Sequence, residues 1–149
     1  MIVASEKLGE LSGRVAMVDG GFDPLHAGHI AYFREAATLG APVLCNLASD
    51  AYVAAKHRPL LSQDERATLI DAIRYIDYVH PSQTTTEAVL RMLRPRFYVK
   101  GEDWRERLPD EERSICEEFG VELVFLDTVR NSSTRILEEY TSHLQGLAR

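Results

Sequence analysis

Apolar and polar positions alternate along this chain between two kinds of segment. Short apolar runs, too short for helices and bounded by glycine, proline or polar clusters, predict buried strands. Segments with apolar residues three and four positions apart predict helices between them. The predicted strands are residues 14–20, 43–48, 78–80, 97–100 and 121–126. The predicted helices are residues 28–39, a segment from 62 through 73, and residues 86–93, 109–119 and 132–144.

Several helix boundaries carry their own sequence signals. Ser62 and Glu65 have the spacing of a capping box, which predicts a helix start after Ser62. Gly40 and Gly120 follow predicted helices, at positions where glycine ends a helix readily. Pro95 stops the helix before it. Residues 1–12 are predicted to be an N-terminal extension with a short leading helix.

Strands that alternate with helices predict a mainly parallel sheet with right-handed crossovers. In such sheets ligands bind outside the carboxyl ends of the strands, near the point where the strand order reverses. Residues at the ends of the predicted strands are therefore the first candidates for a functional site.

Composition narrows the class of protein. A chain of 149 residues with 45% hydrophobic residues is expected to form one domain, residues 1–149. A formal charge of −6 without a basic stripe argues against a nucleic-acid partner. Cys45 and Cys116 are isolated in sequence, which fits a reducing, cytoplasmic compartment. No apolar run approaches the roughly 20 residues of a membrane span, and no signal peptide is recognisable, so no membrane partner is expected.

The segment from Gly20 to His29 is the most informative for function. It joins the first predicted strand to the first predicted helix, and its glycines allow the backbone to approach a ligand. The start of the helix presents free N–H groups to an anion, and His26 and His29 are spaced to lie on one face of the first turn. The segment predicts a phosphate-handling site.

Plainer interpretations of these residues remain open. His26 and His29 could bind zinc as a pair, although no third ligand of a suitable type is nearby in sequence. They could also be structural. Asp23 could be a turn residue whose side chain bonds its own backbone.

The sequence His26-Ala27-Gly28-His29 matches the HxGH signature of the cytidylyltransferase-like nucleotidyltransferases, and Gly21-Phe22-Asp23 occupies the place of their G-x-F-D turn. From about residue 14 to residue 140 the chain resembles glycerol-3-phosphate cytidylyltransferase and the nucleotidyl-transferring domain of ADP-heptose synthase. The resemblance implies an α/β fold with a Rossmann-like parallel five-stranded sheet and helices on both faces. It also implies catalytic roles for both histidines and nucleotide binding by Gly21, Phe22, Asp23 and Gly28.

A second segment, residues 50–66, contains Lys56, His57 and Arg58 in a predicted loop. On its own this is as consistent with a solvated basic stretch as with a binding loop. The family has a lysine in this loop and an arginine in an S-x-x-x-R pattern that contact the triphosphate. The resemblance therefore implies a catalytic Lys56 and a nucleotide-binding Arg66.

The third segment, Lys100-Gly101-Glu102-Asp103-Trp104, follows a predicted strand. It resembles both the KGxD of heptose-type adenylyltransferases and the G-x-D-W of glycerol-3-phosphate cytidylyltransferase. Lys100, Gly101 and Asp103 are thus implied to bind the nucleotide, while Trp104 could cap the core instead. The two resemblances point to different bases, so the choice between ATP and CTP stays open.

The fourth segment opens the last predicted helix. Ser132, Ser133 and Thr134 could be ordinary caps, but they match the family's helix start that holds the β- and γ-phosphates. Asp127 stands where the cytidylyltransferase pattern has arginine, and Arg130 is a candidate to replace it.

These residues predict transfer of a nucleotidyl group from CTP or ATP to the phosphate of a small sugar or polyol, with release of pyrophosphate. The attacking phosphate oxygen is already ionised near neutrality, so the histidines are expected to donate hydrogen bonds rather than accept a proton. Mg²⁺ bound with the triphosphate is the expected cofactor, with no metal site on the protein. A cofactor-precursor acceptor (phosphopantetheine, NMN or FMN) and a non-catalytic nucleotide-binding module are the alternatives. The apolar face of the last helix suits either a homodimer or the core.

Overall fold

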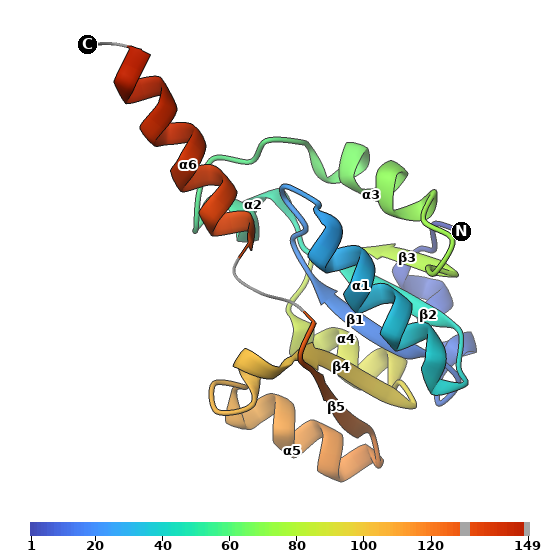
Figure 1. The fold of residues 1–149 in the computed structure, drawn as a ribbon. Helices are drawn as coiled ribbons and strands as arrows, with labels where there is room; N and C mark the ends of the chain where they lie inside the picture. Colours follow the sequence, from blue (N-terminus) through green and yellow to red (C-terminus); the bar gives the residue numbers. More distant parts are fainter. Residues whose placement is uncertain (129–131, 148–149) are drawn as a thin grey trace.

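The computed structural model describes residues 1–128 and 132–147. Its centre is a five-stranded parallel sheet in the order β3-β2-β1-β4-β5 (Figure 1). The Rossmann-like parallel sheet implied by the family resemblance is therefore confirmed. The strands are β1 (Ala16–Gly20), β2 (Val43–Leu47), β3 (Tyr78–Pro81), β4 (Phe97–Gly101) and β5 (Glu122–Leu126), within one or two residues of their predicted bounds.

The sheet is apolar on both faces, as a parallel sheet covered by helices must be. Successive residues of a strand point to opposite faces. Ala16 and Val18 accordingly belong to one buried cluster, while Val15 and Met17 belong to another. Every residue of β2 is buried, which explains why it is apolar except for Asn46.

Helices cover both faces of the sheet (Figure 1). On one face, α1 (Ala27–Ala36) and α3 (Gln63–Asp71) contribute side chains such as Phe33 and Ile70 to the first cluster. On the other face, residues of the 3-10 helix η1 (Ser5–Leu11), α4 (Thr86–Leu93) and α5 (Asp110–Phe119) join the second cluster. A further 3-10 turn, η2 (Ala37–Leu39), follows α1 and leads to Gly40 in the left-handed conformation.

Local caps explain where several helices begin. Ser62 Oγ accepts the Glu65 N–H and the Glu65 carboxylate accepts the Ser62 N–H, which confirms the predicted capping box. The sequence did not predict α2 (Asp50–Ala54), whose Ser49 cap accepts the Tyr52 N–H. A helix of one turn buries only Val53 and is too short to show a period.

The chain order places the candidate site. The chain moves from β1 outward through β2 to β3, then returns to β4 on the other side of β1. The carboxyl ends of β1 and β4 therefore flank the point where the order reverses, which is where open α/β sheets bind ligands. The turn after β1 and the 3-10 helix η3 (Glu102–Trp104) after β4 both lie at this edge.

The last helix, α6 (Ser132–Leu147), begins at this edge and extends away from the sheet (Figure 1). Its apolar residues Ile136, Tyr140 and Leu144 are exposed rather than packed on the sheet. The option that this face belongs to the core is therefore wrong, because the helix leaves the sheet after its first turns. None of the helices within the described residues is long and apolar enough to cross a membrane.

Candidate active site

His26 and His29 lie together at the start of α1. His26 is the N-cap residue, and its Nδ1 accepts the Gly28 N–H at 3.0 Å. One turn on, His29 Nδ1 accepts the His26 N–H at 3.3 Å. The two rings stack with their centroids 3.7 Å apart. Both imidazoles are thus held by the backbone of the helix start itself.

This arrangement fixes the protonation state of both rings. A nitrogen that accepts an N–H carries no proton, so each neutral ring must carry its proton on Nε2. Burial, and to a smaller extent the adjacent His26, lowers the pKa of His29 to about 3. Burial and then the charge of Arg135 lower the pKa of His26. Near neutral pH both rings are therefore uncharged, with Nε2–H groups as their remaining donors.

The His26 Nε2 donor has no partner among the described residues, although it is buried. A buried donor without an acceptor is costly, and such groups often mark a functional site. In residues 1–128 and 132–147, no three His, Cys, Asp or Glu side chains are grouped to hold a metal ion. Within that part of the chain, the histidine pair has the geometry of a hydrogen-bond donor pair and lacks the ligands of a zinc site.

Phe22, in the turn before α1, packs against His29. Phe22, with a positive φ of 51°, is buried and meets the His29 ring edge-on at 4.9 Å. Its ring also lies 3.0 Å from the position that a Cβ on Gly20 would occupy. Gly20 therefore leaves room for the Phe22 ring, and the Phe22 ring packs against His29 and holds it in position.

Gly28 has a similar role beside His26. A Cβ at Gly28 would lie 2.8 Å from His26 Cε1 and 3.0 Å from its Nδ1, closer than side chains tolerate. The glycine inside the HxGH pattern is thus explained by the ring that folds back over it, despite the poor helix propensity of glycine.

His29 lines a cavity of about 200 Å³ at the ends of β1 and β4. This cavity is called the small cavity below. It is also lined by residues at or just after the end of β4 and at the start of α6: Lys100, Gly101, Asp103, Ser133 and Thr134. The Lys100 ammonium lies 4.3 Å from the centroid of the Trp104 ring, and Asp103 pairs with Arg107 at 3.7 Å. Trp104 therefore lines the cavity instead of only capping the core.

A larger cavity of about 740 Å³, called the large cavity below, lies between α2 and α6 and shares Gly21, Phe22, Ser133 and Thr134 with the small one. Lys56 and His57 line it, with the Lys56 ammonium 5.2 Å from the centroid of the Tyr52 ring. Gly21 and Asp23 form part of the same wall. The polar side of α6 closes it with Glu138, Thr141 and Ser142.

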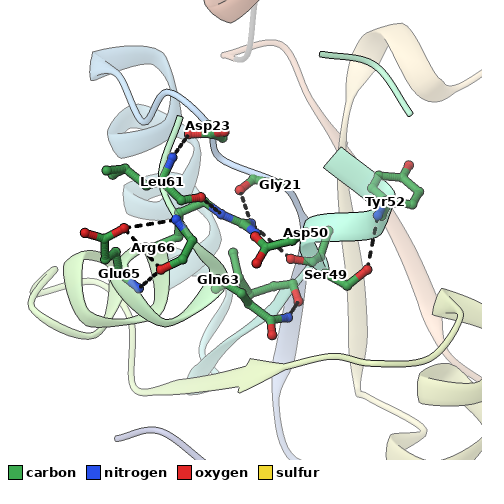
Figure 2. A network of polar contacts seen from close by, with 12 residues as sticks. Gly21, Asp23, Ser49, Asp50, Tyr52, Leu61, Gln63, Glu65 and Arg66 are labelled. Carbon is green, nitrogen blue, oxygen red and sulfur yellow. Dashed lines mark hydrogen bonds and ion pairs between the residues drawn. The ribbon is translucent and has the colours of Figure 1, made fainter. Parts of the chain in front are cut away.

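Arg66 is not at either cavity in this structure; it lies beneath the 50–66 segment with 1% of its surface exposed. Its guanidinium donates to the carbonyls of Gly21, Ala48 and Leu61 and to the Asp50 carboxylate at 2.8 Å (Figure 2). It therefore joins the glycine turn to the 50–66 segment.

Asp23 is also buried, and its carboxylate accepts the N–H groups of Leu60 at 2.7 Å and Leu61 at 3.3 Å. The option that Asp23 bonds its own turn is thus wrong, since its partners are 37 and 38 residues away. Asp23 and Arg66 together hold the segment that carries Lys56 against the turn.

Two features of the fourth segment can be placed only in part. Ser133 Oγ donates to the Pro24 carbonyl at 3.1 Å, which brings the start of α6 against the turn before α1. Arg130 and the Ser132 side chain lie outside the described residues.

Sequence reasoning missed Asp19, Tyr32 and Arg107, which also line the small cavity. Asp19 is the most informative of them. Asp19 is the penultimate residue of β1 and pairs with Lys100 at 3.8 Å. The available signal was a carboxylate at the end of an otherwise apolar strand, next to the glycine turn.

A parallel sheet with this strand order and a paired-histidine turn at its switch point is the arrangement expected of the HxGH nucleotidyltransferases. Residues 17–139 match the family described as Cytidylyltransferase-like. The chain belongs to the cytidylyltransferase-like family.

Curated relatives include two proteins named Bifunctional protein HldE. The one from Pelobacter propionicus is 37% identical over 138 residues, which are 86% of this chain and 28% of the relative. The one from Geobacter sulfurreducens is 37% identical over 146 residues, 93% of this chain and 29% of the relative. The chain thus spans less than a third of the length of these relatives.

Solved structures share the fold. A lipopolysaccharide core biosynthesis protein from Thermoplasma volcanium matches with a TM-score of 0.66 and 22% identity, over 78% of this chain and 98% of that one. Pantothenate synthetase from Thermus thermophilus matches with a TM-score of 0.60 and 18% identity, over 88% of this chain and 63% of that one. At these identities the likeness concerns the fold alone.

Proposed function

We propose that this protein transfers a nucleotidyl group from ATP or CTP to the phosphate of a small sugar or polyol phosphate and releases pyrophosphate. The observation that carries the proposal is the neutral histidine pair. Both Nδ1 atoms are occupied by backbone N–H groups, so both rings keep Nε2–H donors at the start of a helix. Such donors stabilise negative charge, which is what in-line displacement at the α-phosphorus requires.

The proposed chemistry needs no general base. The acceptor phosphate has a second pKa of about 6, so its attacking oxygen is ionised at neutral pH. A new P–O bond forms at the α-phosphorus while the bond to pyrophosphate breaks. His29 lines the small cavity and donates to the oxygens of the α-phosphoryl group, while His26, which lines neither cavity, holds the His29 ring by stacking on it. The lowered pKa of each ring keeps it from acting as an acid that protonates the nucleophile.

The small cavity also contains groups that can stabilise the pyrophosphate leaving group. Lys100, Ser133 and Thr134 share the small cavity with His29 and can hold the phosphates of the nucleotide. Trp104 and Asp103 line the same cavity, and we assign them to contacts with the base or the ribose. We assign Gly21, Phe22 and Gly28 to the cradle that brings the backbone close to the phosphates, with Asp23 and Arg66 holding it from beneath.

Mg²⁺ fits this site as an ion carried by the triphosphate. The described residues offer no group of three acidic or histidine ligands that would hold the ion without a nucleotide. When bound, Mg²⁺ would neutralise phosphate charge and favour departure of pyrophosphate. The protein's own contribution is the set of N–H, hydroxyl and ammonium donors described above.

The large cavity supports a phosphorylated, hydroxyl-rich acceptor. Its lining combines the Lys56 ammonium and the His57 ring with the polar side of α6, which contributes Glu138, Thr141 and Ser142. A sugar phosphate matches this mixture of one charged end and several hydroxyl groups. The name of the curated relatives, Bifunctional protein HldE, is consistent with the heptose-phosphate branch of the resemblance.

The test is a release assay with defined substrate pairs. ATP, CTP, GTP and UTP are each incubated with Mg²⁺ and a panel of acceptors: heptose phosphates, glycerol 3-phosphate, phosphopantetheine, NMN and FMN. Magnesium-dependent pyrophosphate release with a sugar or polyol phosphate is the expected result. Release only with a cofactor precursor would favour the alternative acceptor class, and nucleotide binding without release across the panel would favour a binding module.

A further inference from the structure

A continuous chain of hydrogen bonds crosses the sheet beneath the small cavity and ends on Asp19. It begins at Ser5 in η1, whose hydroxyl lies 2.9 Å from His80 Nε2. His80 Nδ1 lies 2.8 Å from Asn46 Oδ1, and Asn46 Nδ2 donates to Asp19 Oδ1 at 3.0 Å. Four separate elements, η1, β3, β2 and β1, are joined by these side chains.

The direction of each bond in this chain is determined. The Asn46 amide nitrogen can only donate, so its oxygen must be the atom that accepts from His80 Nδ1–H. His80 Nε2 is then free of a proton and accepts the Ser5 hydroxyl. His80 is 1% exposed, and burial lowers its pKa, which keeps the ring neutral. The amide of Asn46 therefore has one orientation, with its N–H aimed at Asp19.

The second carboxylate oxygen of Asp19 is held from the other side. Thr86 Oγ1 donates to Asp19 Oδ2 at 3.1 Å. Tyr98 Oη lies 3.4 Å from the same oxygen, but its proton goes to Glu112 Oε1 at 2.5 Å. Asp19 is thus fixed at both oxygens, and the side chain is 13% exposed, on the floor of the small cavity.

The group that Asp19 faces is the Lys100 ammonium, 3.8 Å away and 9% exposed. Four methylene groups separate this ammonium from the backbone, so its position depends on what holds its end. Three features do so: the Asp19 carboxylate, the face of the Trp104 ring, whose centroid is 4.3 Å from Nζ, and the Tyr98 ring, whose centroid is farther away at 5.9 Å.

We infer that Asp19 is a positioning residue that holds the Lys100 ammonium over Trp104, in the orientation that the nucleotide phosphates meet. The chain Ser5–His80–Asn46 and the hydroxyl of Thr86 hold Asp19 in turn. Only the catalytic consequence rests on the proposed function; the placement of Lys100 can be tested without it.

Trp104 is the only tryptophan of the chain, and both Lys100 and Arg107 lie over its ring, at 4.3 and 4.7 Å from the centroid. Its fluorescence therefore responds to Lys100, and variants made with and without Lys100→Met separate that response from the response to Arg107. Asp19→Asn keeps the shape of the side chain and removes its charge. In the ligand-free protein it is expected to move the emission maximum in the same direction as Lys100→Met. In the double variant, Asp19→Asn is expected to add no further shift, because the group through which it acts is gone.

Glu102→Gln is the matched control. It removes an equal charge from a half-exposed residue of η3 that pairs with Arg105, not with Lys100. Its effect on the emission is expected to be the same with and without Lys100. Thr86→Val is the second variant, should Asp19→Asn fold poorly: it preserves the charge, removes one anchor, and is expected to give a partial shift that Lys100→Met abolishes.

The inference is overturned if Asp19→Asn and Thr86→Val leave the emission of Trp104 unchanged, or if their shifts persist in full with Lys100→Met. The consequence for catalysis is measured by comparing kcat of the parent, the two single variants Asp19→Asn and Lys100→Met, and the double variant. Asp19→Asn is expected to lower kcat for pyrophosphate release about tenfold in the parent and not at all in Lys100→Met. If the parent releases no pyrophosphate with any substrate pair, the proposed function fails, while the emission still decides the role of Asp19.

Discussion

His26 and His29 stack their rings 3.7 Å apart, and each uses Nδ1 to accept a backbone N–H of the helix start. The same bonds that begin α1 therefore orient the two Nε2–H donors. A single local structure provides the helix cap, the tautomer and the candidate catalytic groups.

The lowered pKa of His29 predicts a specific dependence of stability on pH. Its folded pKa of about 3 is below the ordinary value of 6.5. Between these values the unfolded chain binds a proton that the folded chain does not, so stability falls as the pH decreases from about 6.5. The slope contributed by one such proton is about 1.4 kcal/mol per pH unit. His26 and His80 contribute with the same sign because their pKa values are also lowered.

Urea unfolding of the parent and His29→Asn at several pH values between 7 and 5 measures this slope. In His29→Asn, the slope of the unfolding free energy against pH is expected to decrease by nearly the contribution of one proton. In a separate measurement, ¹⁵N spectra of the parent are expected to show His29 as the Nε2–H tautomer. Equal slopes for both proteins, or a titration of His29 near 6.5, would contradict the account.

Gly28→Ala separates stability from activity. Alanine is a better helix former than glycine by about 1 kcal/mol, which favours the folded state. The new Cβ would meet His26 Cε1 at 2.8 Å, so the ring must move. Moving the ring also weakens the cap bond from the N–H of residue 28 to His26 Nδ1, a loss of about 0.5–2 kcal/mol that offsets the gain in helix propensity. We therefore expect a free energy of unfolding within about 1 kcal/mol of the parent's, together with a fall in turnover of about 10²-fold. Gly146→Ala in α6, where nothing lies within 4 Å of the new Cβ, is the control and should retain full turnover.

Arg66 and Asp50 form an ion pair whose members are very unequally buried, at 1% and 51% exposed. Arg66→Met leaves three backbone carbonyls without their donor and is expected to cost about 3 kcal/mol of unfolding free energy. Asp50→Asn is expected to cost less than about 1 kcal/mol. Urea midpoints measure both. A small loss for Arg66→Met, with a large loss of nucleotide affinity, would show instead that Arg66 acts on the triphosphate.

Lys56→Met tests the candidate cation of the large cavity. A charge-assisted hydrogen bond to a phosphate is worth about 1.5–3 kcal/mol, so kcat/KM for pyrophosphate release is expected to fall about 10- to 100-fold. Lys7→Met makes the same change at an exposed lysine of η1 that lines neither cavity. Equal rates for the two variants would remove Lys56 from the site.

The strands and most helices could be predicted because their signals are local. β2 is apolar at every position except Asn46, since both of its faces are buried, and α4 has Val89, Leu90 and Leu93 at helical spacing. By contrast, the apolar residues of α6 predicted a helix correctly but not its place in the fold. Periodicity shows that a helix has an apolar face and does not show what, if anything, covers it.

The histidine pair could be anticipated because its geometry is set within four residues. The positions of Arg66 and Asp23 could not, since their partners come from segments 5 to 45 residues away in sequence. A basic residue in a phosphate-binding motif and one that holds backbone carbonyls look alike in sequence. Asp19 was missed for the same reason: its partners Asn46, Thr86 and Lys100 come from three other elements.

The central claim is that the paired imidazoles stabilise the phosphoryl group during transfer. The most direct measurement compares pyrophosphate release by the parent, His29→Ala and His143→Ala, an exposed histidine of α6 that serves as the control. His29→Ala is expected to unfold cooperatively, to bind nucleotide with most of its affinity, and to lose about 10²- to 10³-fold in kcat. His143→Ala should match the parent. A folded His29→Ala variant that releases pyrophosphate at nearly the parent's rate would contradict the claim.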